Sequence, residues 1–173
     1  WKSTMERQLL AISPKARLLS VDYGKNPKDY QAAPIKITFR YEIPDYALRG
    51  EGEMFFRPMV MNNLYNQVRS YIWIDTSVEN RKYGFKDGCS RLVELDETIQ
   101  LPAGYKLVSA AKDETMQGVG ADFEGSLVQK GNKVLLHNRL ALKKRVYEAS
   151  DWESFRNAVN AHKAYGEYLV IKK

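Results

Sequence analysis

The sequence has little of what reactive sites are built from: it contains one cysteine and two histidines in 173 residues. A single cysteine, Cys89, excludes an intrachain disulfide, and no known local signature surrounds it. A thiol enzyme needs a cysteine beside an imidazole, but His137 falls in an expected strand and His162 in an expected helix. These three residues also lack the short spacings of zinc ligands. The sequence therefore predicts no catalytic residue, no metal and no cofactor.

Long apolar runs and one-sided charge are also missing. No stretch approaches the roughly 18 apolar residues of a membrane-spanning helix, which predicts that this piece has no transmembrane segment. Lysine and arginine exceed the acidic residues by 27 to 21, but they are scattered singly or in short groups such as 143–145. This distribution is typical of a solvated surface and predicts no nucleic-acid partner.

Phosphate-loop and calcium motifs are not found either. The glycines of GVGADFEG, at 118, 120 and 125, are spread too widely for a phosphate fingerprint and precede a strand. Calcium binding through Asp87 or Asp113-Glu114 is conceivable, but there is no EF-hand pattern. Solvated carboxylates are the simpler interpretation.

Length and composition favour one domain over residues 1–173, because 44% hydrophobic residues are enough to fill a core. The first residue is Trp1 rather than Met, and a helix is expected almost at once. We therefore expect a C-terminal fragment of a longer multidomain protein.

Period-two alternation is the main structural signal. It is clearest over 35–43, where apolar and polar residues alternate without a break, and it recurs over 91–101, 122–129 and 133–143. The turn at 130–132 should join the last two strands, and 105–110 should follow 91–101 at a corner or hairpin. Further strands are expected at 16–23, 53–61 and 167–171, with Pro58 placing the second of these at an edge or bulge. Residues 62–67 are predicted to form a loop, followed by a short apolar run at 71–75.

Two helices should flank these strands. Residues 3–12 form an amphipathic pattern with Ser3 and Glu6 at capping-box spacing, and Ser150 and Glu153 repeat that spacing before a second helix. Gly166 should end the second helix, and its Trp152 and Phe155 should pack on the sheet. The predicted class is α+β and predominantly antiparallel: a β-sandwich-like fold with an N-terminal and a C-terminal flanking helix.

Several of these segments occur together in a known order. They are ARLLSVDY after the first helix, PIKITFRYEIPDYA, RKYGF followed by TIQLPAGYKLVSA, and VYEASDWESFRNAV with YLVIKK. In this order the chain resembles the C-terminal, non-catalytic β-sandwich region of bacterial envelope proteins with a transglutaminase-like domain of the papain-like superfamily. Gly84 departs from the pattern, because proline is more usual there, and polar linkers are sparse around Asn62.

The resemblance implies a function as well as a fold. In such proteins the Cys, His and Asp triad lies in an upstream domain, so no catalytic role transfers to this chain. We expect a non-enzymatic accessory domain that supports the catalytic domain of the same polypeptide or presents substrate to it. The resemblance also implies an extracytoplasmic location.

Aromatic residues suggest a second interpretation. At 12% of the chain they are compatible with a surface that binds a glycan or a peptide. The candidates for this ligand surface are Tyr71, Trp73, Arg81, Tyr83 and Phe85. Core packing is the competing interpretation, and we expect Trp73 and Phe85 to be buried and Tyr71 and Tyr83 partly exposed. An autonomous binding module is thus the alternative function, and a hydrolase in its own right is a distant third.

Overall fold

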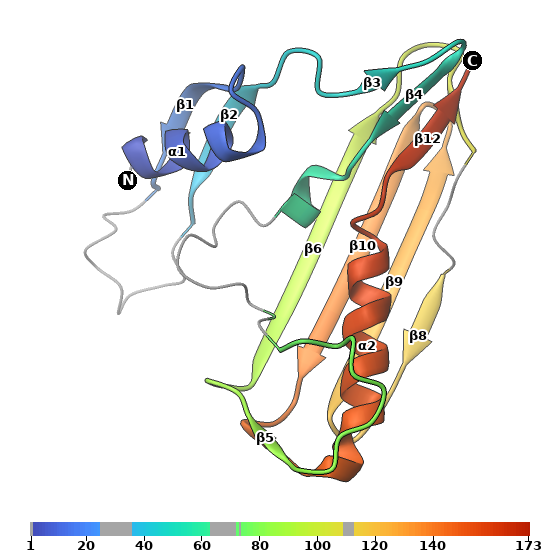
Figure 1. Ribbon diagram of the computed structural model, residues 1–173. Coiled ribbons are helices and arrows are strands. Elements are labelled where there is room, and N and C mark those ends of the chain that lie inside the picture. The colour runs from blue at the N-terminus through green and yellow to red at the C-terminus, as the bar shows by residue number, and fades with distance from the viewer. Residues whose placement is uncertain (1, 25–35, 63–71, 73, 109–112) are drawn as a thin grey trace. The chain divides into compact units, whose positions relative to one another are not determined.

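A computed structural model describes residues 2–24, 36–62, 72, 74–108 and 113–173 (Figure 1). Its contacts divide the chain into two compact units, the first formed by described residues up to Tyr46 and the second by those from Ala47 onward. The expectation of a single domain over 1–173 stays a prediction.

The first unit is a helix with a two-stranded antiparallel ribbon. Helix α1 spans Lys2–Ile12, and β1 (Arg17–Asp22) pairs with β2 (Thr38–Glu42). Met5 and Leu9 are buried one helical turn apart, which confirms the predicted apolar face of α1. The predicted capping box is wrong, because the helix already begins at Lys2 and Ser3 lies inside its first turn.

The second unit is built on a four-stranded antiparallel sheet. Its order is β6 (Arg91–Gln100), β10 (Lys133–Leu142), β9 (Ala121–Lys130) and β8 (Glu114–Met116). Gly131, with a φ of 61°, lies in the turn that joins β9 to β10, as predicted. Figure 1 shows α2 (Trp152–Ala164) running along one face of this sheet.

Alternation explains which face the helix covers. Side chains that point toward α2 are buried, including Phe123 and Leu127 of β9 and Val134, Leu136 and Leu140 of β10. The intervening residues of β10 are half-buried and face away from α2. From α2 itself, Trp152 and Phe155 are buried, which confirms that they belong to the core.

A second four-stranded antiparallel sheet has the order β3 (Leu48–Arg49), β4 (Glu53–Phe56), β12 (Leu169–Lys172) and β7 (Lys106–Leu107). Two further strands, β5 (Phe85–Lys86) and β11 (Val146–Tyr147), form a separate pair. Short 3-10 helices η1 (Met59–Asn62) and η2 (Ala149–Asp151) complete the unit. The predicted α+β, predominantly antiparallel and sandwich-like class with a helix near each end is confirmed. No described helix is long and apolar enough to cross a membrane.

Some local predictions were wrong. The strand expected to reach Met61 ends at Phe56, because Pro58 has no N–H for the ladder and η1 follows. Strand β4 lies inside its sheet rather than at an edge. Of the two alternatives predicted for 101–105, the corner is confirmed and the hairpin is wrong, because β7 pairs with β12 in the other sheet and not with β6. The predicted loop 62–67 and run 71–75 fall largely outside the described residues.

The start of α2 also differs from the prediction. The backbone N–H of Glu148 donates to Asp151 Oδ2 across 2.9 Å, so the capping pair is Glu148 and Asp151 rather than Ser150 and Glu153. This pair organises η2, and α2 continues directly from it. The helix ends at Ala164 with Tyr165 as its C-cap, so Gly166 follows the cap directly, which agrees with the predicted end of the helix.

Candidate functional site

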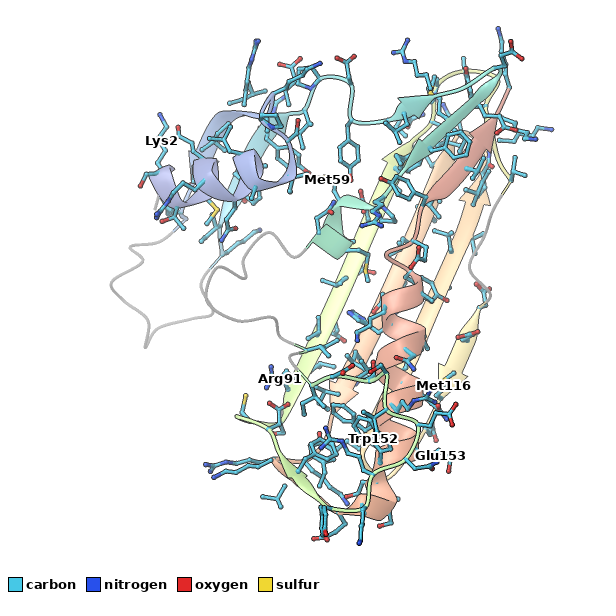
Figure 2. The ribbon with its side chains drawn as sticks, viewed as in Figure 1. Lys2, Met59, Arg91, Met116, Trp152 and Glu153 are labelled. Atoms are coloured by element: carbon cyan, nitrogen blue, oxygen red, sulfur yellow. The ribbon has the colours of Figure 1, made fainter. Side chains whose placement is uncertain are left out.

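Four aromatic rings gather where α2 begins, and we call them the aromatic cluster: Phe85, Tyr147, Trp152 and Phe155. The pairing of β5 with β11 places Phe85 opposite Tyr147, with stacked rings whose centroids are 4.6 Å apart. The first turn of α2 adds Trp152 and Phe155, whose rings meet Phe85 edge-on at 5.4 and 5.0 Å. Figure 2 labels Trp152 at the end of α2 where the helix begins. Of the predicted ligand-surface residues, Phe85 belongs to this cluster.

Arg81 lies against this cluster. Its guanidinium carbon is 4.5 Å from the Trp152 ring centroid and 4.8 Å from that of Phe85, within the range of cation–π attraction. The Nε atom is buried and has no hydrogen-bond partner. The arginine is therefore positioned by ring faces rather than by a carboxylate.

The segment just before Arg81 is tied to α2. Trp152 Nε1 donates to the carbonyl of Val78 across 3.1 Å, and Arg156 Nε donates to the carbonyl of Thr76 across 3.1 Å. Lys163 Nζ also donates to Thr76 Oγ1 across 2.9 Å. These three bonds hold an irregular segment in place, so Arg81 rests on a well-connected support.

The predicted ligand-surface residues have different environments. Arg81 is half-buried, and Phe85 packs in the aromatic cluster but is half-buried rather than buried as expected, because it lies at the outer side of the cluster's strand pair. Tyr83 is 73% exposed, with the Lys82 ammonium 5.6 Å from its ring centroid. Tyr71 and Trp73 lie outside the described residues. The structure thus brings Arg81 and Phe85 together. It adds Trp152, which the sequence predicted to pack on the sheet. It also adds Tyr147, which no sequence pattern singled out.

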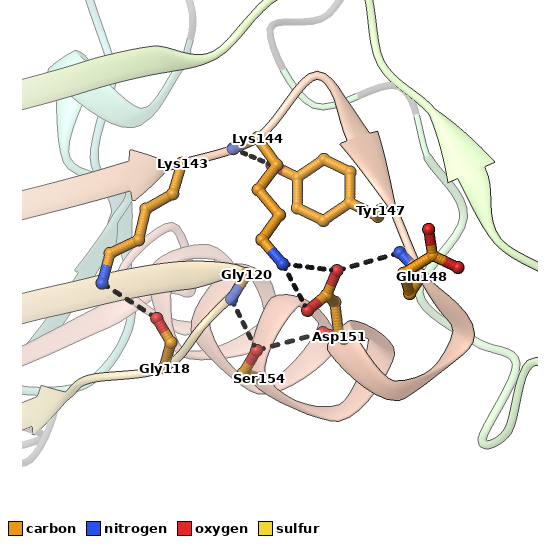
Figure 3. A network of polar contacts seen from close by, with 8 residues as sticks. All are labelled: Gly118, Gly120, Lys143, Lys144, Tyr147, Glu148, Asp151 and Ser154. Atoms are coloured by element: carbon orange, nitrogen blue, oxygen red, sulfur yellow. Dashed lines mark hydrogen bonds and ion pairs between the residues drawn. The ribbon is translucent and has the colours of Figure 1, made fainter.

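A polar network surrounds the capping turn and shares Tyr147 with the aromatic cluster, because the Tyr147 hydroxyl accepts from the backbone N–H of Lys144 (Figure 3). Asp151 is buried, and both of its carboxylate oxygens accept from Lys144 Nζ, at 2.7 and 2.9 Å. The hydrogen bond from Lys144 is the main reason that the pKa of Asp151 lies below its usual value. This carboxylate is therefore an ionised structural group.

The loop before β9 closes on the same turn. Ser154 Oγ accepts from the N–H of Gly120 at 3.1 Å and donates to the carbonyl of Asp151 at 3.0 Å. A Cβ on Gly118 would collide with the Ser154 side chain, so glycine permits this close approach. Lys143 Nζ donates to the Gly118 carbonyl at 2.9 Å and pairs with Asp122, which lowers the pKa of Asp122.

Beside this network lies a hollow of about 710 Å³, lined by the 116–121 segment and the first turns of α2. Its polar groups are hydroxyls, amides and two carboxylates, the exposed Glu153 and the buried Asp151. The network around it satisfies Asp151 and Ser154 internally. The arrangement therefore holds the loop to the helix and offers no activated nucleophile.

The residues with nucleophilic or basic side chains are dispersed. Cys89 is exposed, and no described side chain bonds to its thiol. His137 Nδ1 lies 2.7 Å from Asp96 Oδ1 on the face of the long sheet that points away from α2. His162 is buried, and burial lowers its pKa to about 4. The structure brings neither imidazole to Cys89.

Metal ligands are no better assembled, because the described part of the chain holds no group of three acidic, histidine or cysteine side chains that could bind an ion. Asp87, expected to be solvated, is instead buried and paired with Arg91 Nη2 at 2.6 Å. Asp87 is buried because it continues the β5–β11 pair, where its N–H donates to the carbonyl of Arg145.

Comparison with known proteins gives one family match. The sequence profile of a family described as a domain of unknown function with a solved structure (DUF3858) matches residues 52–170. Among curated proteins, none matches the chain.

One solved structure resembles the fold. It is a crystal structure of a "putative protease" from Parabacteroides distasonis, with 14% sequence identity and a TM-score of 0.47. The similarity covers 57% of this chain and 20% of that protein. This chain thus corresponds to a small part of the length of that protein.

Proposed function

This chain belongs to the DUF3858 family, and we propose that it is a non-catalytic accessory domain of a transglutaminase-like protein. In this role it supports an upstream catalytic domain of the same polypeptide or presents substrate to it, outside the cytoplasm. The proposal starts from the order of the segments ARLLSVDY, PIKITFRYEIPDYA, RKYGF and VYEASDWESFRNAV.

The observation that carries the proposal is that the buried polar groups pair with one another. Asp151 is neutralised by Lys144, Asp87 by Arg91, and the imidazole of His162 lies 2.6 Å from the Asn138 amide oxygen. Nucleophilic catalysis requires a nucleophile within hydrogen-bond reach of a base, and Cys89 has no such neighbour among the described residues. A scaffold or binding role suits this arrangement better than turnover.

The test is the reading frame that encodes the chain. We expect it to continue upstream into a transglutaminase-like domain with a Cys, His and Asp triad, preceded by a signal peptide. In that full-length protein, deleting residues 52–170 should reduce turnover of a large substrate more than turnover of a small one. A reading frame without the triad, or equal effects on both substrates, would remove the accessory role.

A second candidate is an autonomous glycan- or peptide-binding module. The exposed ring of Tyr83, close to the ammonium of Lys82, favours it, because exposed aromatic rings beside polar groups are typical of ligand surfaces. A glycan and peptide array probed with wild type and Tyr83→Ala separates the two. Specific binding that the variant loses supports the module.

A further inference from the structure

Arg81 is a cation whose position is set by aromatic rings. Two ring faces, those of Phe85 and Trp152, hold its guanidinium at 4.8 and 4.5 Å. It makes no ion pair with a described carboxylate, although, after hydrogen bonds from Ser77, its charge contributes to the lowered pKa of Asp75. Its Nε is buried and has no hydrogen-bond partner, so the terminal Nη atoms are the donors that a ligand can reach.

A guanidinium fixed in this way suits a carboxylate. Arginine offers planar, paired N–H donors that match the two oxygens of a carboxylate, and stacking on aromatic rings leaves these donors available. Because the rings set the position of the side chain beforehand, binding costs little side-chain entropy. Arg81 is thus preorganised for one anionic group.

The surroundings favour an anionic partner of some length. Lys82, Lys86 and Arg145 are exposed and form no ion pair within the described chain. Lys86 lies in β5 opposite Val146, and Arg145 comes directly before β11, where its carbonyl accepts from the Asp87 N–H at 2.8 Å. Successive side chains of a strand point to opposite faces, so Lys86 and Arg145 lie on different faces of the β5–β11 pair. Exposed cations on both faces attract a charged segment that runs along this pair more than a single ion.

Strand β5 adds a reason to choose a peptide. Among the strands of the described chain it pairs with β11 alone, so its second edge retains backbone donors and acceptors. An extended peptide can use such an edge, with its side chains reaching neighbouring surface groups. The exposed ring of Tyr83 lies two residues from Phe85 and offers apolar contact for the same segment.

We propose that Arg81, held on Phe85 and Trp152, anchors a binding site for an extended acidic peptide, with one carboxylate of the peptide paired to its guanidinium. The site goes beyond the accessory role, because it requires no catalytic domain. If the chain binds acidic peptide but has no transglutaminase-like neighbour, the site proposed here stands and the accessory role is wrong.

The experiment is a titration of the full 173-residue chain with hexaglutamate, followed by the Trp152 indole signal in ¹H–¹⁵N spectra. Hexaglutamine and an oligogalacturonate are titrated in parallel, at about 0.15 M salt, where exposed charges are screened beyond about 8 Å. The variants are Arg81→Lys, which keeps the charge, and Arg81→Met, which keeps the apolar stem over the rings. Arg49→Met, an exposed arginine of β3, is the control for charge alone.

We expect hexaglutamate to shift the Trp152 signal and to bind Arg81→Met at least about tenfold more weakly than wild type. Arg81→Lys should fall between the two, and Arg49→Met should match wild type. The proposal is overturned if hexaglutamate does not bind, or if Arg81→Met and Arg49→Met lose affinity equally. Stronger binding of oligogalacturonate than of hexaglutamate would show that the site binds an acidic glycan, and the proposal of a peptide ligand would be wrong. Equal melting temperatures of the variants confirm that folding is not the cause.

Discussion

His162 Nδ1 lies 2.6 Å from Asn138 Oδ1, which joins the buried face of α2 to the central strand β10. Because the amide oxygen accepts, Nδ1 carries a proton. Burial lowers the pKa of His162 to about 4, so the imidazole is neutral at pH 7. Asn138 Nδ2 also donates to the His162 carbonyl at 3.4 Å. This is a buried polar pair in an otherwise apolar helix–sheet interface, and it makes stability depend on pH.

The first prediction concerns that dependence. Burial lowers the pKa of His162 to about 4, whereas the unfolded chain titrates near 6.5. The unfolded state therefore takes up a proton first, so the free energy of unfolding should fall between pH 6.5 and 4 by up to about 3 kcal/mol from this group. His162→Asn should remove this part of the fall in urea unfolding measured across the pH range.

His137→Gln serves as the control, because His137 lies on the other face of the sheet and the buried pair is left intact. This variant should keep the dependence of wild type. If His162→Asn and wild type lose stability equally between pH 6.5 and 4, the assignment of His162 as a neutral buried imidazole is wrong.

The second prediction concerns the capping turn. Lys144→Met leaves the buried carboxylate of Asp151 without its cation, which should cost roughly 2–4 kcal/mol at pH 7. The folded pKa of Asp151 is lowered, so the stabilisation is present above the ordinary pKa and is lost as the pH falls through the folded value. The difference between Lys144→Met and wild type should therefore shrink at pH 3, as urea unfolding can measure.

Arg139→Gln tests whether any lost ion pair has this effect. Arg139 pairs with Glu94 at 3.2 Å on an exposed surface, so its removal should cost no more than about 1 kcal/mol. Equal losses in the two variants would mean that the Asp151 pair contributes no more than a surface ion pair.

The third prediction addresses the aromatic cluster. Phe155 is 1% exposed and contacts the rings of Phe85, Tyr147 and Trp152. Phe155→Ala should lower the free energy of unfolding by about 3–5 kcal/mol, and Phe155→Leu by less, because leucine fills more of the cavity. A melting temperature of Phe155→Ala equal to that of wild type would remove this ring from the core.

The long strands and α2 could be predicted because each buries one face, which leaves a periodic pattern of apolar residues in the sequence. The alternation in 91–101, 122–129 and 133–143 anticipated β6, β9 and β10, and Phe155 with His162 anticipated the buried side of α2. The partners of short strands could not be predicted. Two-residue strands such as β5, β7 and β11 carry no periodicity, and contacts distant in sequence decide their pairing.

The capping turn shows the same limit. Glu148 and Asp151 have the same spacing as Ser150 and Glu153, and the salt bridge from Lys144 helps to decide which pair forms the turn. In the candidate site, Arg81 and Phe85 were predicted as candidates for a ligand surface, and Phe85 was expected to be buried. Their support by Trp152 arises from the packing of β5 on α2, which no local pattern encodes.

The proposed non-catalytic role is tested by a turnover assay of the purified chain with peptide, glycoside and acyl-transfer substrates. Cys89→Ala serves as the matched blank, because Cys89 is exposed and its loss should leave the fold intact. We expect wild type and Cys89→Ala to give the same background rate on every substrate. Turnover by wild type that is lost in Cys89→Ala would show that the chain is an enzyme.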